Sequence, residues 1–227
     1  MRIEPLGDSA LLIRVVEESL AAESPDAVLR ATRQLEVAQI RGVVDLVPAY
    51  TTIGVFYNPA KTEAFDDFRT NIQRALRRDL DSARSRVTAT IEVPVCYEDH
   101  EFAPDLDEVA RHAALSPDEV VRRHAEASYR VSCVGFTPGF PYLSGLPREL
   151  ATPRRASPRK EIPAGAVAIG GTQTGIYPRK SPGGWNIIGR TPLRLFDLER
   201  DPPALFHAGD RVRCRKISRK EFDAFPA

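Results

Sequence analysis

Apolar and polar residues follow two different patterns along this chain, and the first pattern occupies residues 1 to about 85. Short apolar runs at Arg2–Pro5 and Ala10–Val16 lie on either side of a polar turn and predict a hairpin. Two further strands are expected at Val43–Val47 and Thr52–Tyr57, where β-branched and aromatic residues gather. These runs predict a small sheet.

Two stretches in the same region carry apolar residues at helical spacing. The first starts at Ser24-Pro25, where a capping residue precedes a proline suited to the first turn, and should end near Gly42. The second starts at Thr62, and its apolar stripe consists of Phe65, Phe68, Ile72, Leu76 and Leu80. We therefore expect an α+β domain over residues 1–85, with a boundary in the polar segment 81–86.

From residue 86 onward, the pattern consists mainly of short strands and of loops rich in glycine and proline. Val87–Val93 alternates at a period of two, which indicates a half-buried strand. Residues 134–192 hold ten of the fourteen glycines and nine of the nineteen prolines, so backbone shape is set at many points. Apolar runs at Ala166–Ile169 and Leu193–Phe196 predict further strands. This pattern is typical of a mainly β domain, a barrel or sandwich, over residues 86–227.

Helices are expected only near the start of this second domain. Asp105–Ala113 is a short candidate, and Ser116–Glu119 forms a capping box that predicts a helix from there. Three residues are expected on one face of that helix: Val120, His124 and Ser128. Near the end of the chain, Asp210–Ile217 alternates apolar and basic residues as a late strand, and Ser218–Ala227 is expected to be a short tail.

Composition narrows the class of protein. The chain has 227 residues, of which 42% are hydrophobic, and no stretch reaches the roughly 18 apolar residues that a membrane helix needs. The N-terminus lacks the apolar segment of a signal peptide, so the cytoplasm is expected. The three cysteines are an odd number without C-x-x-C spacing, and they indicate neither a disulfide framework nor a zinc site.

Positive charge is concentrated in the glycine-rich part of the chain. Residues 122–194 contain twelve Lys or Arg and three acidic residues, whereas the net charge of the whole chain is only +1. Basic clusters beside glycine-rich loops suit a carboxylate or phosphate ligand. A solvated surface or a face for an acidic protein is the alternative that composition leaves open.

Three long motifs in the same region are distinctive. They are G-F-T-P-G-F-P-Y-L from Gly135, I-P-A-G-A-V-A-I-G-G-T-Q-T-G-I-Y-P from Ile162, and S-P-G-G-W-N-I-I-G-R-T-P from Ser181. Two Pro-Arg pairs, Pro153-Arg154 and Pro158-Arg159, precede the second motif. Together they resemble the family of the 5-oxoprolinase B subunit, which is also called KipI-like or allophanate hydrolase subunit 1.

The resemblance implies a fold and an activity. The second domain would be a cyclophilin-like barrel without the prolyl isomerase activity of cyclophilin. With a paralogous, KipA-like C subunit, the chain would phosphorylate 5-oxoproline at the expense of ATP, and the A subunit would complete ring opening to glutamate. ATP, with Mg²⁺, would be a co-substrate, and no tightly bound cofactor is expected. The chain would be inactive alone.

Other functions compete with this interpretation. The same family contains KipI-like inhibitors of a histidine kinase, and its older name points to an allophanate hydrolase or urea carboxylase-related subunit. Nucleic-acid binding is not expected, because few aromatic residues that could stack on bases accompany the arginines. Complete nucleophile-elbow, H-E-x-x-H and phosphate-loop motifs are missing from the sequence.

Candidate site residues follow from the residues and the resemblance together. His124 is a candidate general base, with a structural histidine as the alternative. Arg154 and Arg159 are expected to contact an anion from exposed loops. One wall of the cleft would consist of Gly170, Gly171, Gln173, Thr174 and Gly175. The other wall would consist of Ser181, Gly183, Gly184 and Trp185. For the glycines the alternative is turn chemistry, and Trp185 would either stack on a ligand or plug a barrel end.

The G-F-T-P-G-F-P-Y-L motif also offers apolar side chains for an interface with the C subunit. The four residues concerned are Phe136, Phe140, Tyr142 and Leu143. Burial in the barrel core is their alternative role.

Overall fold

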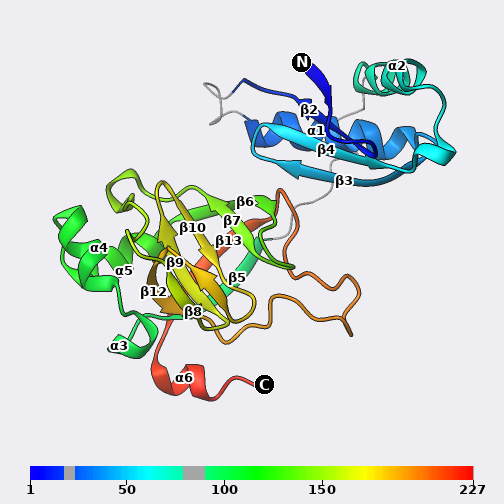
Figure 1. The fold of residues 1–227 in the computed structure, drawn as a ribbon. Helices are drawn as coiled ribbons and strands as arrows, with labels where there is room; N and C mark the ends of the chain where they lie inside the picture. The colour runs from blue at the N-terminus through cyan, green and yellow to red at the C-terminus, as the bar shows by residue number, and fades with distance from the viewer. Residues whose placement is uncertain (18–23, 79–89, 227) are drawn as a thin grey trace. The chain divides into compact units, whose positions relative to one another are not determined.

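The computed structural model describes residues 1–17, 24–78 and 90–226 and is drawn in Figure 1. The chain divides into two compact units, Met1–Val87 and Thr88–Ala227. The boundary expected at residues 81–86 lies outside the described residues and stays a prediction. Each unit is therefore considered by itself.

The first unit contains a four-stranded antiparallel sheet in the order β1-β2-β4-β3 (Figure 1). Its strands are β1 (Arg2–Pro5), β2 (Ala10–Arg14), β3 (Val43–Ala49) and β4 (Thr52–Tyr57). All four strands predicted in this region are confirmed. Alternation along β2 and β4 places Leu11, Ile13, Ile53 and Val55 on one buried face.

Helices α1 (Ser24–Ala38) and α2 (Phe65–Leu76) supply the rest of this core. Helix α2 begins three residues later than expected, because Thr62 is extended, with φ −94° and ψ 159°, at the end of the short 3₁₀ turn η2 (Pro59–Lys61). Phe68 and Ile72 of the predicted stripe are buried. Leu80, its last member, lies outside the described residues.

The described part of the second unit contains a closed barrel of seven strands in the order β10-β7-β6-β13-β5-β12-β9. Its strands are β5 (Thr90–Cys96), β6 (Ser128–Val134), β7 (Pro141–Ser144), β9 (Ala166–Gly170), β10 (Gln173–Ile176), β12 (Asn186–Arg190) and β13 (Arg211–Ile217). β13 pairs parallel with β5 and antiparallel with β6, so the barrel is mixed. The predicted barrel is confirmed, and its cyclophilin-like character stays a prediction.

Smaller elements surround the barrel. A two-stranded sheet is formed by β8 (Arg159–Ile162) and β11 (Ser181–Gly183). The helices are α3 (Asp99–Phe102), α4 (Leu106–Ala113), α5 (Pro117–Glu126), the 3₁₀ turn η4 (Arg148–Leu150) and α6 (Arg219–Asp223). Helices α4 and α5 lie side by side against the barrel (Figure 1).

Helix α5 begins where the sequence predicts, but only the serine half of the expected capping box forms, because the Glu119 carboxylate accepts from Arg122 and Arg123 instead. The Ser116 hydroxyl accepts a hydrogen bond from the Glu119 backbone N–H at 3.2 Å, and Pro117 occupies the first turn. The placement of Ser128 on the same helix was wrong, because α5 ends at Glu126 and Ser128 begins β6. His124 and Val120 share the buried face.

Two expectations for the last part of the chain were also wrong. Leu193–Phe196 forms no strand and makes only one isolated bridge, between Phe196 and Ala204. The facing residues Pro202 and Pro203 have no N–H to donate to a ladder, although Leu195 is fully buried. The expected tail contains α6, which opens with a complete capping box between Ser218 and Glu221.

Helix α5 lies across an opening of the barrel. Its His124 contacts both Tyr97, just after β5, and Thr174 on β10, and these two strands are not neighbours in the barrel. Val120 of α5 and Val109 of α4 belong to the same buried cluster as interior strand residues. None of the described helices is long and apolar enough to cross a membrane.

Candidate functional site: the Trp185 cluster and the arginines of the barrel unit

The three motifs meet around one aromatic side chain, Trp185, which is only 5% exposed. Its ring lies 5.7 Å from that of Phe140 and 5.8 Å from that of Tyr142, both edge to face. Tyr177 packs on Phe140 at 5.1 Å. Such edge-to-face contacts each add about 0.5–1.5 kcal/mol to the free energy of burial. We refer to Phe140, Tyr142, Tyr177 and Trp185 as the Trp185 cluster.

Glycines allow these rings to approach the backbone. A Cβ on Gly170 would lie 2.4 Å from the Trp185 indole, and one on Gly183 would lie 2.3 Å from the Tyr177 hydroxyl oxygen. A Cβ on Gly175 would meet the Phe140 ring at 2.9 Å. The two predicted walls therefore meet, and these glycines have a packing role there.

The remaining glycines of the predicted walls lie in turns. Gly171 has φ +66° in the turn between β9 and β10, and it exchanges two backbone hydrogen bonds with Thr152, at 2.7 and 3.1 Å. The Gly184 carbonyl accepts from the Arg155 backbone N–H at 2.8 Å. Gln173 begins β10 and is half-buried.

Arg154 is an exposed cation beside Trp185. Its guanidinium lies 5.7 Å from the centre of the Trp185 ring, a cation–π contact worth about 0.5–1 kcal/mol at an exposed site. Ser181 begins β11, and its buried hydroxyl oxygen has no hydrogen-bond partner among the described residues. Of these two predicted site residues, Arg154 therefore has a polar group that a ligand can reach from solvent, whereas the hydroxyl of Ser181 is unsatisfied but enclosed.

Arg159, the other predicted anion contact, is engaged by the protein itself. Asp105, whose side chain is 4% exposed, accepts from both Nη atoms of Arg159 at 2.7 and 2.9 Å and from Arg155 at 2.6 Å. The Ile187 backbone N–H donates to the same carboxylate at 2.7 Å. We call Asp105, Arg155 and Arg159 the Asp105 clamp. It joins the residue before α4 to β8 and β12.

His124 is fully buried, and both of its ring nitrogens have partners. Nε2 lies 3.0 Å from the Thr174 hydroxyl, and Nδ1 lies 2.8 Å from the Tyr97 hydroxyl. Thr174 donates its proton to the Ala168 carbonyl at 3.0 Å. We therefore assign the proton of the neutral ring to Nε2, with Tyr97 donating to Nδ1.

Burial lowers the pKa of His124 from 6.5 to about 3. A general base needs a pKa near the working pH and a path to its substrate. The contacts of His124 favour a structural role, and its catalytic role stays a prediction.

The cysteines are also enclosed. Cys96, Cys133 and Cys214 are buried and form no disulfide. Burial raises the pKa of Cys133 to about 11 and that of Cys214 to about 12, so both are thiols at neutral pH. Among the described residues, no group of three or more His, Cys, Asp or Glu side chains is arranged to hold a metal ion.

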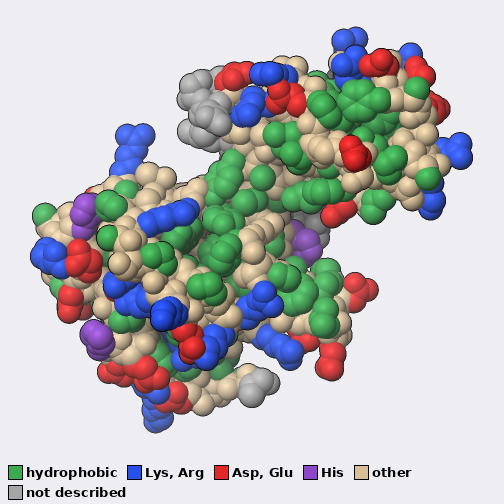
Figure 2. Space-filling model, in the orientation of Figure 1, with side chains coloured by type: hydrophobic (Ala, Val, Ile, Leu, Met, Phe, Trp, Pro, Cys, Tyr) green, Lys and Arg blue, Asp and Glu red, His purple; other side chains and the backbone are tan. Residues whose placement is uncertain are grey.

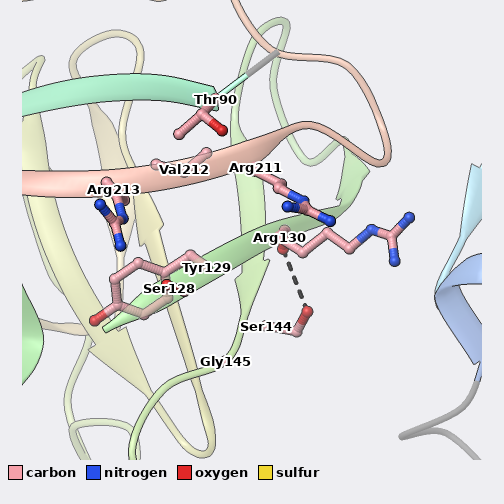
Figure 3. A pocket seen from close by; sticks show the side chains of 9 residues that line it. All are labelled: Thr90, Ser128, Tyr129, Arg130, Ser144, Gly145, Arg211, Val212 and Arg213. Carbon is pink, nitrogen blue, oxygen red and sulfur yellow. Dashed lines mark hydrogen bonds between the residues drawn. The ribbon is translucent and has the colours of Figure 1, made fainter. Parts of the chain in front are cut away.

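A groove of about 420 Å³ opens elsewhere on the barrel unit (Figure 3). Its lining residues are Thr90, Ser128, Tyr129, Arg130, Ser144, Gly145, Arg211, Val212 and Arg213. We call it the arginine groove. None of the predicted site residues lines it.

The comparisons with known proteins agree over most of the chain. A family model described as carboxyltransferase domain, subdomain C and D, matches residues 1–206. The 5-oxoprolinase B subunit of Bacillus subtilis (strain 168) is 40% identical over 234 residues, which cover 99% of this chain and 96% of the relative. The chain belongs to the family of 5-oxoprolinase B subunits.

Two solved structures resemble this chain, one in both sequence and fold and the other in fold alone. TTHA0988 has a TM-score of 0.77 at 36% identity, and the match covers 92% of this chain but only 40% of TTHA0988. The urea carboxylase of Kluyveromyces lactis has a TM-score of 0.73 over 97% of this chain and 22% of its own length. At 20% identity the second likeness concerns the fold alone.

Sequence reasoning missed two features of this family member. Asp105 was only the start of an expected helix, and nothing local connects it with arginines 50 and 54 residues away. The arginine groove was also missed, although the alternation of Arg211, Val212 and Arg213 did indicate a strand with a basic face. Its partner strand could not be inferred from that alternation.

Proposed function

We propose that the chain is the B subunit of an ATP-dependent 5-oxoprolinase. It acts with a paralogous C subunit in the phosphorylation of 5-oxoproline by ATP, as its magnesium complex, and the A subunit completes ring opening to glutamate. The observation that carries this proposal is the similarity to known 5-oxoprolinase B subunits along nearly the whole chain. The cytoplasm and a cyclophilin-like barrel are parts of the same proposal.

Inactivity of the isolated chain is the second part of the proposal. The candidate base His124 and the thiols of Cys133 and Cys214 are enclosed in the barrel unit, with pKa values of about 3, 11 and 12. A shared site, to which partner subunits contribute the reacting groups, accounts for this arrangement. In that site the chain supplies binding and orientation rather than bond breaking.

We assign the ligand to the exposed guanidinium of Arg154, which lies over the buried Trp185 cluster. Arg154 offers a guanidinium fork to the carboxylate of 5-oxoproline or to a phosphate of ATP, and Trp185 holds that fork over its face. Arg159 contributes indirectly, because the Asp105 clamp fixes the start of β8.

Phe136 is the contact that we propose for the C subunit. Of the four motif residues considered for the interface, Phe140 and Leu143 are buried and Tyr142 is half-buried, whereas Phe136 is 63% exposed. Phe136 also has φ +66°, a left-handed conformation that costs a non-glycine residue roughly 1–3 kcal/mol. A strained, exposed aromatic residue suits the desolvated centre of an interface.

Co-expression of the chain with the A and C subunits tests the proposal. The complex should hydrolyse ATP in a 5-oxoproline-dependent manner, and the isolated chain should not.

Arg154→Ala should weaken the apparent affinity for the anionic ligand by about 1.5 kcal/mol or more, since a charged hydrogen bond is lost. Phe136→Ala should weaken co-purification with the C subunit. Leu198→Ala, at a residue that is 84% exposed, is the matched control and should leave the complex intact.

Two results would count against the proposal. Full turnover of 5-oxoproline by the isolated chain would exclude a shared site. A chain that ignores the C subunit but binds and inhibits a histidine kinase would move the assignment to a KipI-like regulator.

A further inference from the structure

The arginine groove is built from side chains in register across four barrel strands. Arg211 of β13 lies directly opposite Arg130 of β6, and Arg130 lies opposite Ser144 of β7. On the other side of β13, Arg211 is in register with Thr90 of β5. Residues directly opposite each other in a sheet project from the same face. The row therefore places two arginines between Thr90 and Ser144, and the Ser144 hydroxyl donates to the Arg130 carbonyl at 3.3 Å.

A second row lies beside the first. Arg213 follows Arg211 two residues along β13, about 7 Å away, and projects from the same face. It is in register with Ser128 of β6. Figure 3 shows Arg211 and Arg130 extending alongside each other, with Arg213 farther along the strand. The groove thus gathers three arginines, with the hydroxyl groups of Thr90 and Ser128 beside them.

Two of these arginines, Arg211 and Arg213, lie on one strand, and Arg211 is in register with the third, Arg130. No acidic residue is among those that line the groove in the described part of the chain. Asp210, the neighbour of Arg211, instead accepts a hydrogen bond from the His207 backbone N–H at 2.8 Å.

The next arginine on the same face of β13 provides the contrast. Arg215 pairs with Glu92 at 2.8 Å and with Glu221 at 3.6 Å. Glu92 is in register with Arg213 but is bonded to Arg215. For Arg211 and Arg213 no ion pair with an acidic side chain forms within the described residues. The strand therefore has a neutralised end and an end that attracts an anion.

We propose that the arginine groove binds a small polyphosphate group, either free pyrophosphate or the phosphate chain of a nucleotide. Guanidinium forks match phosphate oxygens in pairs, and hydroxyl groups donate to the oxygens that remain. Two linked phosphates meet both arginine rows at once, which a single phosphate does not. A volume of about 420 Å³ suits a small molecule.

The groove recognises the phosphates and not a base. Tyr129, the aromatic residue in its lining, is 2% exposed, and its hydroxyl donates to the His124 carbonyl at 2.7 Å, so its ring cannot stack on a nucleobase. ATP and tripolyphosphate should therefore bind with similar affinity. This proposal goes beyond the 5-oxoprolinase function and does not depend on it. Binding to the groove can be measured on the full 227-residue chain, without partner subunits and without turnover.

Calorimetric titration at low ionic strength tests the proposal, with inorganic phosphate, pyrophosphate, tripolyphosphate and ATP as probes. Arg211→Gln and Arg213→Gln should each weaken pyrophosphate binding by about tenfold or more, the loss expected for one charged hydrogen bond. The double variant should not bind. Arg215→Gln removes the same charge from the same face outside the groove, and it should change the affinity less than twofold.

The expected order is pyrophosphate and tripolyphosphate above inorganic phosphate, with ATP within about threefold of tripolyphosphate. Absence of pyrophosphate binding to the unaltered chain would overturn the proposal. An equal loss in Arg215→Gln would reduce the effect to general surface charge. Binding of ATP without binding of tripolyphosphate would place nucleotide recognition elsewhere on the chain. Circular dichroism of each variant checks that the fold is retained.

Discussion

The Asp105 clamp and the arginine groove both consist of arginines on the barrel unit, but they differ in what faces those arginines. In the clamp, one buried carboxylate receives three hydrogen bonds from two guanidinium groups. In the groove, Arg211 lies between Arg130 on one neighbouring strand and Thr90 on the other. The clamp therefore stabilises the fold from within, whereas the groove holds positive charge that an external anion can neutralise.

The difference shows that counting charges does not locate an anion site. The basic stretch at residues 122–194 contains Arg155 and Arg159, whose guanidinium groups are already engaged. Figure 2 shows acidic side chains beside several of the Lys and Arg side chains on the face that it draws. Arg211 and Arg213, by contrast, lie outside that stretch. The two regions differ in whether their arginines pair with acidic side chains, and not in how many basic residues they contain.

The largest effect is expected when the clamp loses its carboxylate. Asp105→Ala leaves two half-buried guanidinium groups and the Ile187 N–H without their acceptor, and should lower the free energy of unfolding by about 3 kcal/mol. Urea titration followed by circular dichroism measures it. Asp107→Ala, at an exposed position two residues on, is the control and should cost less than about 1 kcal/mol. Equal losses in both variants would show that the clamp adds nothing.

The next effect concerns His124, which the barrel encloses as fully as the clamp encloses Asp105. Its pKa is about 3 in the folded chain and near 6.5 in the unfolded chain. Between these values the unfolded state binds more protons, so stability falls as the pH drops below 6.5. The loss should reach about 2–3 kcal/mol at pH 4.5.

Urea titrations at several pH values, combined with an NMR titration of the histidine rings, measure this loss. In His124→Gln the slope of stability against pH between 6.5 and 4.5 should become shallower. His112→Gln, at an exposed position on α4, should keep the original slope. A His124 ring that titrates near pH 6 in the folded chain would contradict the prediction and would revive its role as a general base.

A smaller effect is expected in the Trp185 cluster, beside the clamp in the motif region. Gly170→Ala places a Cβ 2.4 Å from the Trp185 ring and should cost about 1–3 kcal/mol through overpacking. In Gly184→Ala the nearest atom lies at 3.6 Å, so the loss should stay below that of Gly170→Ala. Thermal unfolding of both variants gives the comparison. A tolerated Gly170→Ala would mean that this glycine serves a ligand rather than the packing.

The smallest expected effect is a gain in stability, and it concerns the arginine groove. Arg211→Gln removes a positive charge from the position opposite Arg130 and should raise the free energy of unfolding by about 0.2–1 kcal/mol in low salt. Salt should reduce this gain, because exposed charges are screened. Arg215→Gln loses an ion pair and should not stabilise the chain. Urea titration at two salt concentrations measures both variants, and a destabilised Arg211→Gln would mean that this arginine has a structural role like that of Arg159.

Local signals in the sequence predict some elements and misjudge others for identifiable reasons. The capping residue Ser116 predicts the start of α5, because its side-chain hydrogen bond reaches a backbone N–H only three residues away. A capping box at Ser218 marks the start of α6. The polar composition of this stretch nevertheless resembles that of a terminal tail. Leu193–Phe196 has the apolar run of a strand without the ladder, since a run of apolar residues records burial and not pairing.

The strands of the first unit, the α5 cap and the family follow from the sequence alone, because each depends on neighbouring residues or on long, distinctive runs. Which arginines are engaged follows only from the folded chain. Asp105 reaches Arg159 across 54 residues, and Arg211 comes to face Arg130 because β13 inserts between β5 and β6. Strand order in a barrel is a property of the whole chain, and side chains that are distant in sequence become neighbours only when the barrel closes.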